Sequence, residues 1–186
     1  GSPEERAAEN YAVKVVRTPD IPTLGEAWNL GICNATGDYL TTANTDDRYY
    51  IGGLQAMVDA LDNRPEIGLV FSQVDQDNGR YIFPWKRLDR GTGEVKDIYK
   101  ILKTRCIIGP MPLWRREIHR RISYYFDEFM TVAADYDMWT KMARAGVRFW
   151  YFSESCGVYM KREDGLEHAN PELCRLESKQ IREAMA

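Results

Sequence analysis

The stretch that decides the fold is Tyr39-Leu40-Thr41-Thr42-Ala43, followed directly by Asn44-Thr45-Asp46-Asp47-Arg48. Its first half predicts a short strand, and its second half is a polar cluster in which two carboxylates stand side by side. In open α/β sheets, ligands bind beyond the carboxyl ends of the strands. If this strand belongs to such a sheet, the cluster after it is a candidate binding site.

The elements around this stretch alternate between strand and helix. Apolar residues at helical spacing predict helices over 24–37 and 54–61. Runs rich in β-branched residues predict strands over 13–17 and 67–74. Strands that alternate with helices of this length favour parallel pairing through crossover helices. We therefore expect an α/β fold with a mostly parallel sheet covered by helices on both faces.

The second half of the chain is less regular at first. Residues 75–105 contain two turn signals and predict a hairpin followed by a mobile loop. Residues 107–115 are apolar but hold two prolines, which predicts an irregular or edge strand. The remaining predicted elements are a helix over 134–145, strands over 147–152 and 156–160, and a final helix over 171–186.

Composition fits one folded domain of 186 residues, with 44% hydrophobic and 28% charged residues. A net charge of −3 gives no broad electrostatic footprint for nucleic acid. No apolar run approaches the roughly 20 residues that span a bilayer, and no secretory signal is visible. Cys33, Cys106, Cys156 and Cys174 lack metal-ligand spacing and predict reduced, mostly buried thiols, with a disulfide pair as the alternative.

Asp46 and Asp47 are adjacent carboxylates, which repel one another unless a cation or hydrogen-bond donors compensate them. Mg²⁺ or Mn²⁺ bridging a diphosphate would do so, because Mg²⁺ usually takes one or two protein carboxylates plus phosphate oxygens. The alternative is that the pair caps the following helix.

Two further segments carry candidate chemistry. Asp135 and Asp137 lie at the start of the helix over 134–145, where a carboxylate would serve as a general base. The alternative is a structural role, because the helix dipole favours acidic residues in the first turn. In the charged loop 161–168, Lys161, Arg162 or His168 would close over a phosphate; the alternative is a solvated surface loop.

Taken in order, these segments resemble the family 2 nucleotide-sugar glycosyltransferases of the GT-A fold, of the bacterial type, from about Val13 to Glu167. The first half of the resemblance lies in Gly25-Glu26-Ala27-Trp28-Asn29-Leu30-Gly31-Ile32, in Ala35-Thr36-Gly37-Asp38-Tyr39-Leu40, and in the acidic cluster. The acceptor-side half lies in Gly109-Pro110-Met111-Pro112-Leu113-Trp114-Arg115-Arg116, Phe126-Asp127-Glu128 and Ala134-Asp135-Tyr136-Asp137-Met138-Trp139.

The resemblance implies a role for each matching residue. Asp46 and Asp47 match the family's DxD-type motif, where one carboxylate holds the metal and its neighbour contacts the nucleotide; we assign the metal to Asp47, with Asp46 beside it. Asn44 stands where many members carry the first Asp of this motif. Asp135 matches the acidic residue of the family's catalytic "ED" motif, with Ala134 in place of the usual Glu.

Three residues receive secondary roles. Asp137 is the second candidate for the base. Arg162 and His168 fall in the region that often closes on the diphosphate. With 75–105 as an acceptor-side insert, residues 1–186 then form a single, partial GT-A domain that ends in the helix over 171–186.

The implied reaction is an inverting transfer from a UDP- or GDP-linked sugar to a hydroxyl of a carbohydrate or lipid-linked acceptor, as in polysaccharide biosynthesis. The alternatives are a non-catalytic GT-A-like binding module, in keeping with Asn44 and Ala134, and a metal-dependent nucleotidyltransferase. No QxxRW-like segment follows Asp135, which argues against a processive synthase.

Family members begin with a strand, a helix and a second strand that ends in a base-binding Asp, and none of these precedes Val13. We therefore expect this chain to lack the first βαβ unit and to bind a nucleotide sugar weakly or not at all on its own. The sheet edge left open would favour a homodimer. The absence of a visible secretory signal and of an apolar span predicts a cytoplasmic protein, either free or attached peripherally to the inner face of the membrane.

Overall fold

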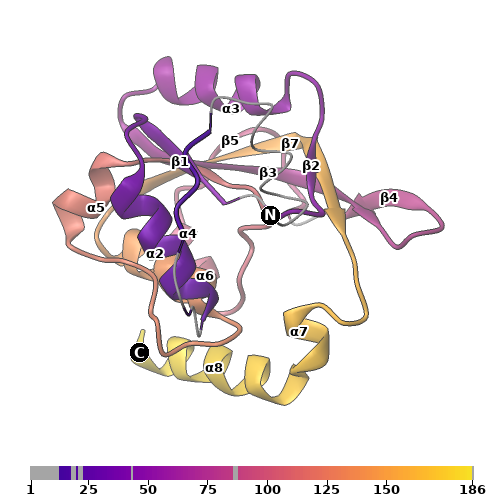
Figure 1. Cartoon of the computed structure of the whole chain (residues 1–186). Helices are drawn as coiled ribbons and strands as arrows, with labels where there is room; N and C mark the ends of the chain where they lie inside the picture. Colours follow the sequence, from indigo (N-terminus) through magenta and orange to yellow (C-terminus); the bar gives the residue numbers. More distant parts are fainter. Residues whose placement is uncertain (1–12, 18–19, 21–22, 43, 86–87, 186) are drawn as a thin grey trace.

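A mixed β-sheet forms the centre of the molecule (Figure 1). The computed structural model describes residues 13–17, 20, 23–42, 44–85 and 88–185. Within these residues the main path of the sheet runs in the order β1-β6-β3-β7-β2, with β4 paired to β3 and β5 to β7. The strands are β1 (Tyr39–Thr41), β2 (Arg48–Tyr49), β3 (Ile67–Asp77), β4 (Ile82–Trp85), β5 (Gly93–Glu94), β6 (Leu113–Arg115) and β7 (Arg148–Met160).

The sheet is mixed, which corrects the expectation of a mostly parallel sheet. Of the pairings between described strands, only that of β3 with β7 is parallel, and the others are antiparallel. Because β6 is antiparallel to both β1 and β3, the strands β1, β3 and β7 still point the same way. Alternation of strands and helices thus predicted these directions correctly. It did not reveal that β6 inserts in reverse between β1 and β3, which makes it an inner strand and not an edge strand.

Helices cover both faces of the sheet, as expected (Figure 1). On one face, α3 (Gly53–Asp62) packs Met57, Ala60 and Leu61 against the sheet. The larger core lies on the other face, where Met138, Trp139 and Met142 belong to one helix. The helices other than α3 are α2 (Leu24–Asn34), α4 (Ile98–Leu102), α5 (Glu117–Ile122), α6 (Ala134–Arg144), α7 (Leu166–Ala169) and α8 (Pro171–Ala184).

Helix α2 is fixed at its start and along its length. Thr23 and Glu26 form a capping box, in which each side chain accepts from the other's backbone N–H. The buried Asn29 side chain donates to the Phe126 carbonyl (2.9 Å) and accepts from the Phe126 N–H (3.0 Å). Its amide also donates to Glu128 (2.9 Å). Asn29 therefore ties together two segments that lie far apart in the sequence and that both carry the family resemblance.

Other local expectations also needed correction. Residues 13–17 form no regular strand, and Val13 is 57% exposed, because β-branched composition makes a strand only where a neighbour pairs with it. The two strands expected over 147–160 are one, β7, which bulges between the positions paired with Ser72 and Gln73. Residues 75–105 do contain the expected hairpin, β3–β4, but also β5 and α4.

All four cysteines are free, in agreement with the expectation of unpaired thiols and not with the alternative of a disulfide pair. Only Cys156 is buried, whereas Cys33 is exposed and the other two are partly buried. The expectation of mostly buried thiols was therefore wrong. None of the helices in the described residues is long and apolar enough to cross a membrane.

Candidate active site

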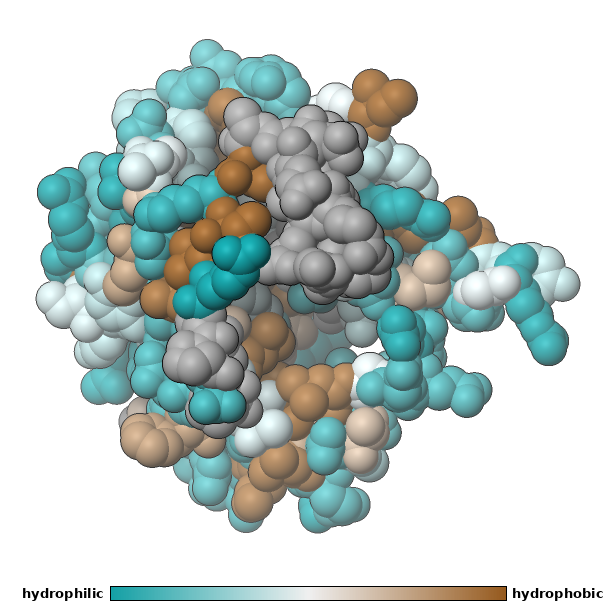
Figure 2. All heavy atoms as spheres, viewed as in Figure 1, coloured by the Kyte–Doolittle hydropathy of each residue, from teal (hydrophilic) through white to brown (hydrophobic). Residues whose placement is uncertain are grey.

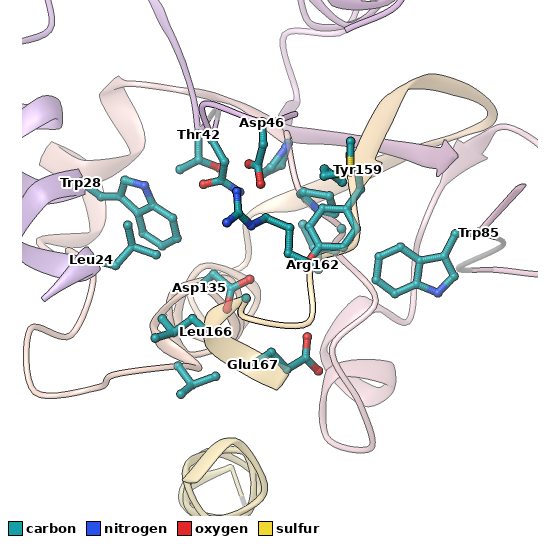
Figure 3. A pocket seen from close by; sticks show the side chains of 18 of the residues that line it. Leu24, Trp28, Thr42, Asp46, Trp85, Asp135, Tyr159, Arg162, Leu166 and Glu167 are labelled. Carbon is teal, nitrogen blue, oxygen red and sulfur yellow. The ribbon is translucent and has the colours of Figure 1, made fainter. Parts of the chain in front are cut away.

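A cavity of about 440 Å³ opens where β1 and β7 end (Figure 3). Thr42, Asn44 and Asp46 reach it from the end of β1, and Tyr159 and Met160 from the end of β7. The wall opposite is built by the starts of α2 and α6, and by the loop before β6 that holds Gly109, Pro110 and Pro112. The polar cluster therefore lies at the carboxyl ends of strands that point the same way, as the sequence predicted.

The two adjacent carboxylates face different surroundings. Asp46 lines the cavity. Asp47 instead accepts hydrogen bonds from the Met160 backbone N–H and the Asn44 side-chain amide, both at 3.0 Å. Burial raises the pKa of the Asp47 carboxyl, and these two donors partly oppose the rise. Asp47 thus ties the loop after β1 to the end of β7, and Asp46 is the carboxylate of the pair that faces the cavity.

The two acidic residues of α6 are also separated. Asp135 lines the cavity, and its carboxylate accepts from the Tyr136 N–H at 2.7 Å. Asp137 is 8% exposed, does not line the cavity, and pairs with Lys141 (2.6 Å). Burial raises the pKa of Asp137, against the lowering effect of Lys141. Since residues two apart do not share a helix face, the geometry leaves Asp135 as the candidate base.

Arg162 brings a cation close to these carboxylates. In Figure 3 its side chain extends into the cavity that Asp46 and Asp135 also line. Its guanidinium forms a two-point ion pair with Asp164, at 2.8 and 2.7 Å, which raises the pKa of Arg162. This pair is exposed to solvent, and an exposed ion pair stabilises a protein little, so breaking it costs little free energy. His168 is exposed and lies outside the cavity lining, so the structure does not bring it to the site.

Aromatic side chains that sequence reasoning did not assign to the site complete the cavity. Trp28 and Trp139 line one wall and pack against Phe126. Trp85 on the β4 hairpin and Tyr159 on β7 line another wall, with their ring centroids 5.5 Å apart. The aromatic run around Trp85 was the available sequence signal. The half-buried ring of Trp85 offers an apolar face on which a sugar ring could stack.

The charge on the cavity wall is predominantly negative. Among the described residues that line it, Asp46, Asp135, Asp164 and Glu167 stand against the guanidinium of Arg162. A diphosphate entering this cavity would be repelled unless a cation accompanies it. Within the part of the chain that the structure describes, no group of three or more His, Cys, Asp or Glu side chains could hold a metal alone. The donor set therefore fits an ion that takes one carboxylate from the protein and its other ligands from phosphate and water.

A second cavity, of about 780 Å³, lies beside α5 and is less suited to a ligand. Arg115 donates to the carbonyls of Leu61 (2.6 Å) and Ile67 (2.9 Å), and Arg116 donates to that of Gly37 (2.5 Å). His119 is 2% exposed and bridges Trp114 and the Tyr124 carbonyl. These polar groups brace the backbone, so the smaller cavity is the better candidate.

Comparisons with known proteins place the fold and the family. A model described as glycosyl transferase family 2 matches residues 3–123. The chain therefore belongs to glycosyl transferase family 2, and its mixed sheet with flanking helices is a GT-A fold. No curated protein sequence matches it.

Among solved structures, the chain is similar to TarS of S. aureus. It matches the structure of TarS residues 1–349 with 16% identity and a TM-score of 0.69, over 98% of this chain and 50% of that one. It matches the complex of the same protein with UDP-GlcNAc with 17% identity and a TM-score of 0.70, over 96% and 56%. The chain thus spans about half the length of these structures, and the likeness concerns the fold.

Proposed function

We propose that this chain carries the catalytic centre of an inverting glycosyltransferase, which moves a sugar from a nucleotide diphosphate to an acceptor hydroxyl. One observation carries the proposal: Asp46, Asp135 and Arg162, which are far apart in sequence, line the same cavity. A nucleotidyltransferase would also use a carboxylate and a metal. The match of residues 3–123 to glycosyl transferase family 2 favours glycosyl transfer instead, and in that reaction Asp135 on the opposite wall suits a base for the acceptor.

In this reaction Asp135 takes the proton of the acceptor hydroxyl while that oxygen attacks the anomeric carbon. The bond between the anomeric carbon and the diphosphate oxygen breaks, and its electrons leave with the diphosphate. Arg162 exchanges its contact with Asp164 for the departing diphosphate. Asp47 holds the loop that presents Asp46.

Asp46 is the residue that would hold Mg²⁺ or Mn²⁺. When bound, such an ion neutralises charge that accumulates on the leaving diphosphate. This assignment moves the metal from Asp47, which the sequence favoured, to its neighbour, because both Asp47 oxygens already accept hydrogen bonds from the protein.

The experiment that tests the proposal is release of UDP from UDP-GlcNAc, the donor bound in the TarS complex, measured with Mn²⁺ and again with excess chelator. We expect release that depends on the metal and that competes with free UDP. Release that is equal with and without the metal contradicts the proposal. Binding of UDP-GlcNAc without release at any metal concentration also contradicts it and favours a non-catalytic binding module.

We further propose that the acceptor sugar stacks on Trp85, because the β4 hairpin extends the cavity away from Asp46. The hairpin projects from the body of the molecule and mixes hydrophobic and hydrophilic atoms (Figure 2). Trp85 lies at the base of this projection, with Tyr159 beside it. Tyr81, at the outer end, is 72% exposed.

Trp85→Ala is therefore expected to raise the KM for a sugar acceptor about tenfold, which corresponds to roughly 1.4 kcal/mol. Hydrolysis of the donor in the absence of acceptor should change less than twofold. The measurement is transfer from UDP-GlcNAc to a panel of methyl hexopyranosides, with Tyr81→Ala on the same hairpin as the matched control. An equal rise in KM for both variants would refute a specific platform at Trp85.

A further inference from the structure

Glu177 of α8 carries a buried carboxylate that binds three consecutive backbone N–H groups. The side chain is 5% exposed. One oxygen accepts from Thr131 (2.8 Å), and the other accepts from Val132 (2.9 Å) and Ala133 (2.8 Å). Burying a charged carboxylate is costly unless hydrogen bonds replace its water. Three short donors supply that replacement, so Glu177 and the 131–133 segment define one another's positions.

The 131–133 segment needs such a partner because it leads into α6 without a local cap. Ala133 is the N-cap residue of this helix and has no side chain that can accept a hydrogen bond. A carboxylate near a helix N-terminus is also favoured by the helix dipole. Glu177 supplies both effects from a position 44 residues away from Ala133 in the sequence.

Helix α8, which carries Glu177, is itself held in place by packing. Ile181 and Met185, further along the chain, are 3% and 6% exposed and belong to the large core. The Tyr99 hydroxyl donates to the Met185 carbonyl at 3.4 Å. Figure 1 shows α8 running beneath α6. Glu177 is therefore fixed by the packing of Ile181 on the next turn of its own helix. Through its three hydrogen bonds, it fixes the position of the 131–133 segment in turn.

The segment it holds is part of the cavity wall. Val132 and Asp135 both line the cavity, and Ala133, one of the three donors, lies between them. We propose that Glu177 is a positioning residue for Asp135: it fixes the turn from which the base projects. This inference rests on the proposed function of Asp135. A displacement of a reacting group by about 1 Å costs on the order of 100-fold in rate, so the clamp has a kinetic consequence.

The test compares Glu177→Gln with Glu183→Gln, which alters an exposed glutamate on the same helix. The glutamine side chain keeps the shape of Glu177 but turns an amide donor toward an N–H group. We expect amide hydrogen exchange at Thr131, Val132 and Ala133 to accelerate at least tenfold, and the side-chain carboxyl ¹³C signal of Asp135 to shift. In UDP release, kcat should fall about tenfold, with KM for UDP-GlcNAc changed less than twofold. Glu183→Gln should alter none of these.

Three results would overturn the proposal. Unchanged exchange and an unchanged Asp135 signal in folded Glu177→Gln would show that the clamp does not hold the turn. A lower melting temperature with kcat unchanged well below it would show a structural role only. If Glu177→Gln does not fold, fast exchange of the three amides in the unaltered protein would decide against the clamp. The NMR readouts need no activity, so a protein that binds UDP-GlcNAc but releases no UDP refutes the proposed function separately from the clamp.

Discussion

Asp135→Asn is expected to lower kcat for UDP release by about 10²- to 10⁴-fold, the range that a general base contributes. Asparagine keeps the size of the side chain and its hydrogen bond to the Tyr136 N–H, but it cannot take a proton. KM for UDP-GlcNAc should change little, because the base acts on the attacking oxygen and not on the nucleotide. Steady-state kinetics with saturating Mn²⁺ measures both constants.

Asp137→Asn is the matched comparison for this prediction. Asp137 is buried, pairs with Lys141 and does not line the cavity. Because asparagine keeps the shape of the side chain and this position lies outside the cavity, kcat should stay within about threefold of that of the unaltered protein. Loss of turnover in Asp137→Asn and retention in Asp135→Asn would reverse the assignment of the base.

Asp46→Asn should produce the second large effect, on the metal. We expect the Mn²⁺ concentration for half-maximal UDP release to rise at least tenfold and kcat/KM to fall about 100-fold, or roughly 2.7 kcal/mol. The reason is that Asp46 is the carboxylate of the adjacent pair that lines the cavity. A titration of UDP release against Mn²⁺ at fixed donor concentration measures it.

Asp47→Asn is the matched comparison that distinguishes the role of Asp47 from that of Asp46. Its side chain would still accept from the Met160 N–H, so the loop after β1 should hold its course. The half-maximal Mn²⁺ concentration should then stay within about twofold. If Asp47→Asn, and not Asp46→Asn, shifts the metal requirement, then the metal lies on Asp47, as the sequence alone suggested.

Much of the site was accessible to sequence reasoning because it depends on order and periodicity. The acidic cluster follows a predicted strand, and the helix that carries Asp135 has a clear apolar stripe, so both could be placed from the sequence alone. The meeting of these elements in one cavity also agrees with the expected directions of β1 and β7.

The remaining features depend on distant partners that local patterns do not contain. The apolar residues of β6 do not record that this strand runs in reverse between β1 and β3. Asp46 and Asp47 have the same side chain, and tertiary contacts distinguish them, above all the hydrogen bond that Asp47 accepts from Met160, 113 residues later. Glu177 looks like any charged residue of a surface helix until the 131–133 segment is brought to it. In each case, tertiary contact and not propensity decides the role.

Binding of a nucleotide sugar in the cavity between Asp46, Asp135 and Arg162 is central to the proposed function. NMR mapping of backbone and side-chain shifts during titration with UDP-GlcNAc and Mg²⁺ tests it most directly, and it detects the weak binding expected of this chain. We expect metal-dependent shifts at Asn44 and Asp46, in the 162–167 loop and around Asp135. Shifts confined to the cavity lined by Arg115 and Arg116, or identical with and without the metal, would contradict it.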